Sequence, residues 1–356
     1  MAKFHKDKVP ISAHYSIMAK DIQKIVNKNE CCLFAEAGCV DKPIKSHSIQ
    51  ESSLRTISDS TNHVYSFKSP KYEDLQKIYN DAIYHPKKVG VADATVFHGF
   101  CSSHDTELFY CVENEEIEPN ISQLNALYFR PMARSLHFNN GLKKGIEHIT
   151  EYDYPESQKP QESLLYIAEQ NKYLDNVLAQ MSFDKTMLAK QILSSSASKD
   201  SYLFLRLKNI PDVMLSTLLA PTFDLDGVEL LNGNIPQDIQ HLSVTISSDI
   251  VGGYAILQWS KKDQFINSFV DSFIKSNYDW NKFVAYLMIF TDFVFSPDWW
   301  DNLNEVSHEI IMHFAMAPHF TCLRQDIFVG FKVYKHFLKK SIEFVDWEVV
   351  EQKLNV

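Results

Sequence analysis

The sequence predicts an α+β protein built in two parts. Residues 121–150 and Ser163–Leu193 repeat apolar side chains at the spacing of one helix face. Residues Tyr202–Trp259 change to the alternation of apolar and polar side chains that is typical of strands, interrupted by two glycines. From Asp263 the pattern becomes mostly helical and rich in aromatic residues. Long helices and a run of strands in one chain indicate the α+β class.

A polar segment separates the two parts. Glu151–Pro160 contains two prolines and little apolar character, which favours a linker. The chain has 356 residues and 45% apolar side chains, more than one small core requires. We therefore predict an N-terminal domain over residues 1–155 and an α+β recognition or regulatory domain with a helical C-terminus over residues 160–356.

The first part has shorter elements. Helices are expected in four segments: Ile17–Val26, Glu51–Ile57, Tyr72–Ile83 and the stretch from Asp105 through Val112. Extended, strand-like segments are expected in three others: Lys42–Gln50, His63–Phe67 and Lys88–Phe100.

Charge and hydropathy exclude several classes of protein. The formal net charge is −10, which argues against coating nucleic acid by bulk electrostatics but leaves a local basic site open. No apolar run reaches the roughly 18 residues that a membrane span needs. The start, Met1–Pro10, is charged and has no apolar core of a signal peptide. We expect a cytoplasmic protein without a membrane segment.

The cysteines suggest a metal site. Five of the six lie in the first third of the chain: Cys31, Cys32, Cys39, Cys101 and Cys111. Tetrahedral zinc sites take four Cys or His ligands, commonly as two close pairs on tight turns. We predict that Cys32 and Cys39 form one pair and that Cys101 and His104, spaced as Cys-x-x-His, form the other.

Alternatives to this ligand set stay open. Cys31 competes with Cys32, and His98 precedes Cys101 closely enough to serve as a ligand. Small buried cysteines at an ordinary helix start would explain the same pattern without a metal. Further along, Arg134-x-x-His137 is too closely spaced for the Arg-x(4–6)-His motif of HEPN ribonucleases, so we interpret it as a helical surface pair.

Residues 30–115 resemble a known family. The series Cys32…Cys39…Ser46-His47-Ser-Ile-Gln…Gly-Phe-Cys101-Ser-Ser-His104-Asp105 is similar to the HNH-type, treble-clef (ββα-metal) zinc finger. It resembles in particular uncharacterised bacterial proteins with an N-terminal "SHSIQ…GFC..HD" signature. The resemblance implies a structural Zn²⁺ held by the two pairs.

The resemblance also implies an activity. In HNH nucleases a histidine of the first β-hairpin is the general base that activates water against a phosphodiester, beside a divalent ion. By analogy His47 would be this base, and Asp105 would help to hold a catalytic Mg²⁺ or Mn²⁺. The implied function is an endonuclease acting on DNA or RNA, by analogy in bacterial phage defence and with a partner protein of such a system.

The sequence departs from this family in ways that leave a second function open. Ser46 stands before His47 where active enzymes carry an acidic residue or a histidine, and more than fifty residues separate His47 from Cys101. The alternative is a non-catalytic, zinc-stabilised module that binds nucleic acid or protein.

Overall fold

The computed structural model describes residues 31–67, 84–151, 161–197, 199–230, 241–320, 326–340 and 342–355. Three predictions fall outside these residues: the helices Ile17–Val26 and Tyr72–Ile83, and the linker, of which only Glu151 is described.

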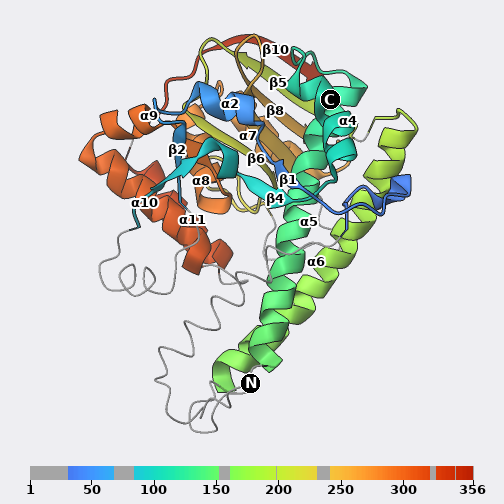
Figure 1. The fold of residues 1–356 in the computed structure, drawn as a ribbon. Coiled ribbons are helices and arrows are strands. Elements are labelled where there is room, and N and C mark those ends of the chain that lie inside the picture. Colours follow the sequence, from blue (N-terminus) through green and yellow to red (C-terminus); the bar gives the residue numbers. More distant parts are fainter. Residues whose placement is uncertain are drawn as a thin grey trace.

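The chain folds as an α+β protein, as predicted (Figure 1). The elements of its first part are η2 (Ala35–Ala37), β1 (Lys45–His47), α2 (Glu51–Thr56), β2 (His63–Ser66), β3 (Lys87–Gly90), η3 (Val91–Asp93), β4 (Val96–His98), α4 (Ser102–Glu113) and α5 (Ile121–Glu151). Those that follow are α6 (Gln161–Leu193), β5 (Ser201–Leu207), β6 (Val213–Leu219), β7 (Leu242–Ser248), β8 (Gly253–Trp259), α7 (Gln264–Lys275), α8 (Trp280–Phe290), β9 (Val294–Phe295), α9 (Pro297–Asn302), α10 (Glu305–Phe320), α11 (Asp326–Leu338) and β10 (Val349–Asn355).

Most expected elements lie where the periodicity places them, but two differences are informative. Helix α4 begins at Ser102, so His104 and Asp105 both belong to its first turn. The C-terminal region is helical only as far as α11, because the chain ends in strand β10. This strand pairs along the edge of the sheet, and its side chains are mostly exposed, so no apolar stripe marks it in the sequence.

The described residues form two antiparallel sheets. The large sheet has eight strands in the order β10-β5-β8-β7-β6-β9-β2-β3, and the small sheet consists of β1 and β4. The two-residue strand β9 joins the parts, because it pairs with β2 on one side and with β6 on the other. Strands from both sides of the predicted linker therefore share one sheet.

Helices cover both faces of the central strands, which explains their nearly continuous burial. Strand alternation divides the side chains: Leu203 and Leu205 pack with helices α7, α8, α10 and α11, whereas Phe204 packs with α4, α5 and α6. The result is a three-layer arrangement in which α5 and α6 form a long helical pair beside the sheet (Figure 1). The aromatic residues Phe293, Phe295 and Trp300 belong to the first of these cores.

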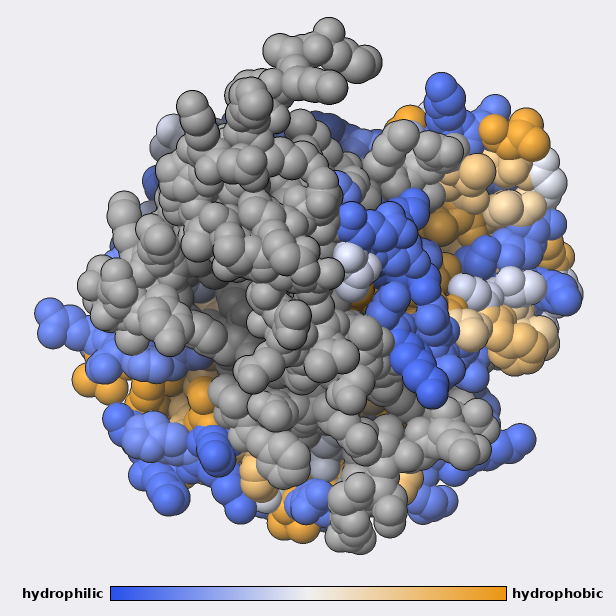
Figure 2. Space-filling view, turned by 90° about the horizontal axis from the view of Figure 1, so that it is seen from below, coloured by the Kyte–Doolittle hydropathy of each residue, from blue (hydrophilic) through white to orange (hydrophobic). Residues whose placement is uncertain are grey.

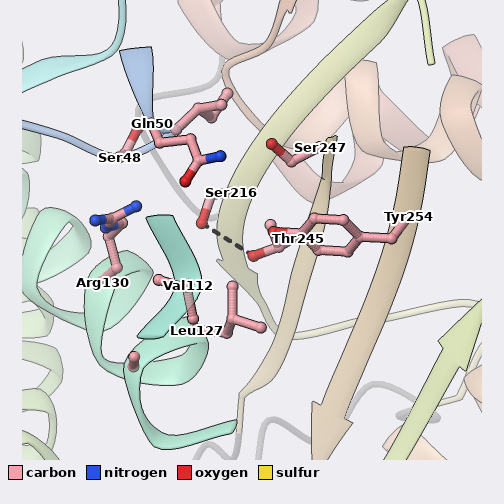
Figure 3. Close-up of a pocket in the computed structure, with 11 residues that line it drawn as sticks. Ser48, Gln50, Val112, Leu127, Arg130, Ser216, Thr245, Ser247 and Tyr254 are labelled. Carbon is pink, nitrogen blue, oxygen red and sulfur yellow. Dashed lines mark hydrogen bonds between the residues drawn. The ribbon is translucent and has the colours of Figure 1, made fainter. Parts of the chain in front are cut away.

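A polar seam joins the segment after β1 to the large sheet (Figure 3). Gln50 is buried and donates through Nε2 to the Ser248 carbonyl at 3.2 Å. Beside it, the hydroxyl groups of Ser216 and Thr245 lie 3.1 Å apart. The cavity along this seam measures only about 10 Å³, which is too small for any ligand larger than a water molecule. The seam is therefore a packing feature rather than a binding site.

The surface mixes polar and apolar groups. On the face seen in Figure 2, blue hydrophilic residues lie next to smaller orange groups of hydrophobic residues. Phe138 of α5 and Phe183 of α6 are among the exposed apolar side chains. Within the described part of the chain, no helix combines the length and apolar character needed to cross a membrane.

Candidate metal centre

The first ligand pair lies on a tight turn. Between Cys32 and Cys39 the chain forms the single turn η2, and Gly38 ends it in the left-handed conformation, with φ 78°. The Gly38 N–H donates to the Ala35 carbonyl at 2.8 Å. Glycine adopts this conformation without the steric cost that a Cβ brings. The turn reverses the chain, so Cys39 returns to the side of Cys32.

The second pair lies at the start of α4. Cys101 immediately precedes the first helical residue, and His104 is in the first turn, so the three-residue spacing directs both side chains to one side of the helix. Two contacts bring the earlier turn against this helix start. The Leu33 N–H donates to the Gly99 carbonyl at 2.8 Å, and the Cys101 N–H donates to Cys32 Sγ at 3.4 Å.

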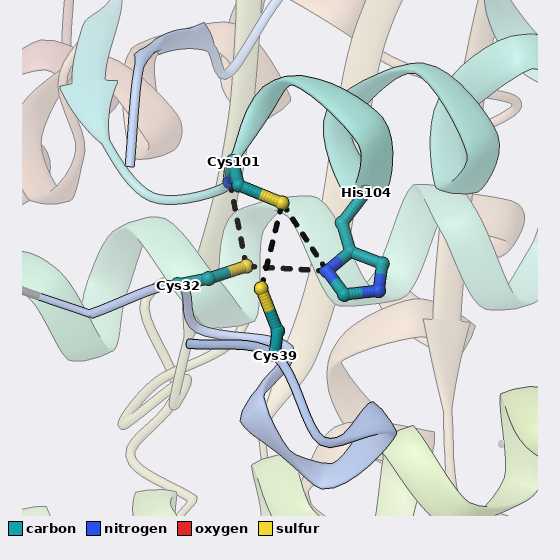
Figure 4. Close-up of side chains that lie close together, drawn as sticks. All are labelled: Cys32, Cys39, Cys101 and His104. Atoms are coloured by element: carbon teal, nitrogen blue, oxygen red, sulfur yellow. Dashed lines mark hydrogen bonds between the residues drawn. The ribbon is translucent and has the colours of Figure 1, made fainter. Parts of the chain in front are cut away.

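The four side chains converge on one point (Figure 4). His104 Nδ1 lies 3.5 Å from Cys32 Sγ and 3.4 Å from Cys101 Sγ. Cys39 Sγ lies 3.6 Å from Cys101 Sγ, and all four ligand atoms lie within 4.8 Å of one another. These four residues are close enough to bind a single metal ion. They are the predicted set, and no other group of this kind occurs among the described residues.

The cluster is buried on the side of Cys32 and Cys101, whereas Cys39 and His104 are partly exposed. Cys32 and Cys101 are each only 2% exposed, and the Phe34 ring meets the His104 imidazole edge-on at 5.1 Å. Burial, reinforced by the neighbouring thiols of Cys101 and Cys39, raises the pKa of the Cys32 thiol to about 11. Without a cation the thiol therefore keeps its proton at neutral pH, whereas a bound metal stabilises the thiolate.

Helix α6 supports the first ligand pair from outside. Lys185 Nζ donates to a Glu36 carboxylate oxygen at 2.6 Å and to the Leu33 carbonyl at 3.2 Å. The Thr186 hydroxyl donates to the same carboxylate oxygen at 2.8 Å. Burial opposes ionisation of Glu36, but these two donors outweigh it and lower the pKa of the carboxyl. The turn that carries Cys32 and Cys39 is thus fixed by residues about 150 positions away.

The supporting contacts give a testable expectation. Replacing Lys185 with methionine leaves all four ligands in place but removes two bonds to their turn, so metal affinity should fall about 10- to 100-fold. Competition with a chromophoric chelator measures this affinity. Lys190→Met, at an exposed position of the same helix, should leave it unchanged. Equal affinities of the Lys185 and Lys190 variants would contradict the supporting role.

His47, the predicted general base, is the last residue of β1 and lies outside the metal cluster. Its Nε2 contacts the Val91 carbonyl oxygen at 3.1 Å. A carbonyl oxygen only accepts hydrogen bonds, so this contact assigns the imidazole proton to Nε2 and leaves Nδ1 as the basic nitrogen.

Asp105, in the first turn of helix α4, lies against the other face of β1, the strand that carries His47. Its carboxylate accepts a hydrogen bond from the Ser46 hydroxyl, and the Ser46 Oγ in turn accepts from the Phe100 N–H at 3.3 Å. Burial raises the pKa of the Asp105 carboxyl, and the bond from Ser46 partly opposes this rise. Because successive side chains of a strand point to opposite faces, His47 points away from the face that Ser46 shares with Asp105.

The alternative ligands lie apart from the cluster. Cys31 is exposed, and His98 lines a separate cavity beside β4. The supporting residues Glu36, Lys185 and Thr186 were not identified in the sequence, where no motif links positions so far apart. Arg134 and His137 lie on one side of α5, as helical spacing predicts, but His137 is buried rather than on the surface.

Fold and site together define an α+β protein with one cluster of three cysteines and a histidine that can bind a metal ion. No protein-family model, no curated protein and no solved structure matches the chain.

Proposed function

We propose that Cys32, Cys39, Cys101 and His104 hold one structural Zn²⁺. Bonds of about 2.3 Å to sulfur and about 2.0 Å to nitrogen place neighbouring ligands of a tetrahedral zinc about 3.5–3.8 Å apart. Three of the six distances between the ligand atoms, 3.4 to 3.6 Å, agree closely with these values, and all six are within 4.8 Å. Three thiolates and one imidazole fill all four positions, which is typical of a structural rather than a catalytic zinc.

The order of the elements supports a treble-clef arrangement around this ion. A turn supplies two ligands, the antiparallel pair β1–β4 follows, and the start of α4 supplies the other two. The long insertion between His47 and Cys101 includes β2 and β3, which extend the large sheet. The insertion thus separates the two strands of the hairpin in the sequence while they stay paired in space.

On this framework we infer an HNH-like nuclease, and the observation that carries the inference is His47. It occupies the end of the first strand of a strand–strand–helix unit, and the Val91 carbonyl directs Nδ1 to be the proton acceptor. A base of this kind can take a proton from a water molecule that attacks a phosphodiester. Mg²⁺ or Mn²⁺ would be held by Asp105 and the phosphate oxygens of the DNA or RNA substrate, since Mg²⁺ needs few protein ligands there.

One observation favours the second candidate, a zinc-stabilised module that binds nucleic acid or protein without cleaving it. Asp105 accepts a hydrogen bond from Ser46, on the face of β1 opposite to His47, so the expected base and the expected metal ligand do not share a face. In such a non-catalytic module the zinc ion only stabilises the fold. The expected role in phage defence stays a prediction under either candidate.

Replacing His47 with alanine tests the nuclease. Loss of a general base should lower Mg²⁺- or Mn²⁺-dependent cleavage of DNA or RNA about 10²- to 10⁴-fold, with the zinc content unchanged. Cleavage is followed on labelled single- and double-stranded substrates, and zinc by elemental analysis. His313→Ala, on an exposed part of α10, is the matched control.

The other outcomes assign different roles. Undiminished cleavage by the His47 variant would remove His47 from the mechanism. Loss of zinc would make it a ligand. If the unmodified protein cleaves no nucleic acid under any of these conditions, the non-catalytic module is the better description.

A further inference from the structure

A large cavity lies apart from the metal centre, between the small sheet and the β2–β3 end of the large sheet. Its volume is about 710 Å³, within the range of about 300–1,000 Å³ that is usual for small-molecule sites. Strand β4 forms one wall and helix α5 another, and strands β2, β3 and β9 of the large sheet form the third. Among the described strands, β4 pairs with β1 along one edge and with no strand along its other edge.

A buried histidine faces this cavity. His137 is only 8% exposed, and its ring contacts the Phe97 ring at a centroid distance of 5.8 Å. Burial, together with His98, Arg134 and Lys144, lowers the pKa of His137 to about 4, so the imidazole is neutral at pH 7. No residue in the described ranges forms a hydrogen bond with it. The His137 imidazole lines the cavity and can therefore form a hydrogen bond with a ligand there.

Arg134 lies one helical turn before His137 and lines the same cavity. Its Nη2 donates to Asp292 Oδ2 at 2.8 Å, whereas a guanidinium has five N–H donors in a planar fork. Asp292 is 64% exposed, so this ion pair is weak and open to competition. The other carboxylate of the wall, Asp93, is paired with Lys45 at 2.8 Å. Both acidic groups are therefore neutralised by neighbouring cations.

The remaining wall is aromatic. Phe97, Phe138 and Phe293 line the cavity together with the polar groups. A ligand that suits these walls needs an anionic group for Arg134 and a flat or apolar part for the phenyl rings. Phosphate matches the guanidinium fork through two parallel hydrogen bonds, and nucleobases stack on aromatic side chains.

We propose that this cavity binds a nucleoside phosphate, with the phosphate held by Arg134 and His137 and the base against the aromatic wall. The site is distinct from the zinc centre and does not depend on nuclease activity. In the free protein Asp292 is paired with one nitrogen of the Arg134 guanidinium. When the phosphate binds, Asp292 is either displaced or shares the guanidinium with the phosphate.

Calorimetric titration of the zinc-loaded, 356-residue protein with AMP and with adenosine tests this site. AMP should bind, and adenosine should bind at least tenfold more weakly because it has no phosphate. Arg134→Gln should weaken AMP binding at least tenfold, and His137→Phe should weaken it several-fold while keeping a ring of similar size. Asp292→Asn should strengthen AMP binding, because it frees the guanidinium.

A matched control separates this site from general electrostatics. Lys275→Gln removes the same unit charge from α7, which covers the opposite face of the sheet, and should leave AMP affinity unchanged. Thermal melting confirms that each variant is folded. Equal binding of adenosine and AMP, no binding of AMP, or unchanged AMP affinity in the folded Arg134 variant would each overturn the proposal. Because His47→Ala should bind AMP normally, failure of the nuclease proposal leaves this test intact.

Discussion

Replacing Cys101 with serine is expected to abolish zinc binding and to unfold the region around β1, β4 and α4. Cys101 is 2% exposed, and its Sγ lies 3.4 Å from His104 Nδ1 and 3.6 Å from Cys39 Sγ, so its loss removes one of the four ligands from a buried position. Structural zinc contributes roughly 10–16 kcal/mol of binding free energy, comparable with the whole stability of a domain, about 5–15 kcal/mol. The serine variant should therefore lose much of its cooperative unfolding transition.

The measurements are the zinc content per chain and the thermal unfolding curve. Cys111→Ser, on the same helix but outside the cluster, is the matched control and should keep its zinc. A Cys101→Ser protein that keeps stoichiometric zinc and melts like the unmodified chain would refute the metal centre.

The same centre should respond to pH in a defined direction. Burial raises the pKa of the Cys32 thiol, so a zinc ion must displace a proton to bind. Apparent zinc affinity should consequently rise with pH and fall in acid. Acidification and a chelator should unfold the same region, and added zinc at neutral pH should restore it.

The sequence was sufficient to predict the two pairs of this cluster because each pair is encoded locally. The spacing of Cys101 and His104 is compatible with a helix start, and a short turn ending in glycine lies between Cys32 and Cys39. Local periodicity likewise predicted α5, α6 and the strand-rich segment from residue 202 to residue 259. Within each pair and each of these elements the determining residues are close in the sequence, whereas the approach of Cys39 to Cys101, 62 positions apart, depends on the fold.

The features that escaped prediction depend on distant partners. Strand β9 has only two residues and exists because β2 and β6 lie on either side of it. The cavity beside α5 combines Arg134 with Asp292, which is 158 positions away. The pair Arg134-x-x-His137 was visible in the sequence, but its burial in a cavity wall is set by packing between the two sheets.

A second large effect is expected at Asp249, in the turn between β7 and β8. Its side chain is fully buried, and both carboxylate oxygens lie 2.9 Å from Arg206 Nη1. The Ile117 N–H donates to the same carboxylate at 2.7 Å, and Arg206 Nη2 donates to the Ile117 carbonyl at 3.0 Å. This group ties the loop after α4 to the large sheet.

Helix α4 is thus held at both ends by different chemistry. The metal cluster fixes its first turn, and the buried ion pair fixes the loop that follows its last turn. Replacing Asp249 with alanine leaves the buried Arg206 with Glu116, half-exposed and 3.5 Å away, as its remaining acidic partner. Loss of the buried partner typically costs about 3–5 kcal/mol. Zinc content should be unchanged, because none of the four ligands is touched.

Urea unfolding of Asp249→Ala measures this cost. Asp271→Asn, whose exposed carboxylate lies 3.8 Å from Lys275, should change stability by less than about 0.5 kcal/mol. The double variant Asp249→Leu, Arg206→Met removes both charges and should recover part of the loss, because no buried charge is then left unpaired. If the alanine variant instead matches the Asp271 control, the ion pair does not anchor the loop after α4.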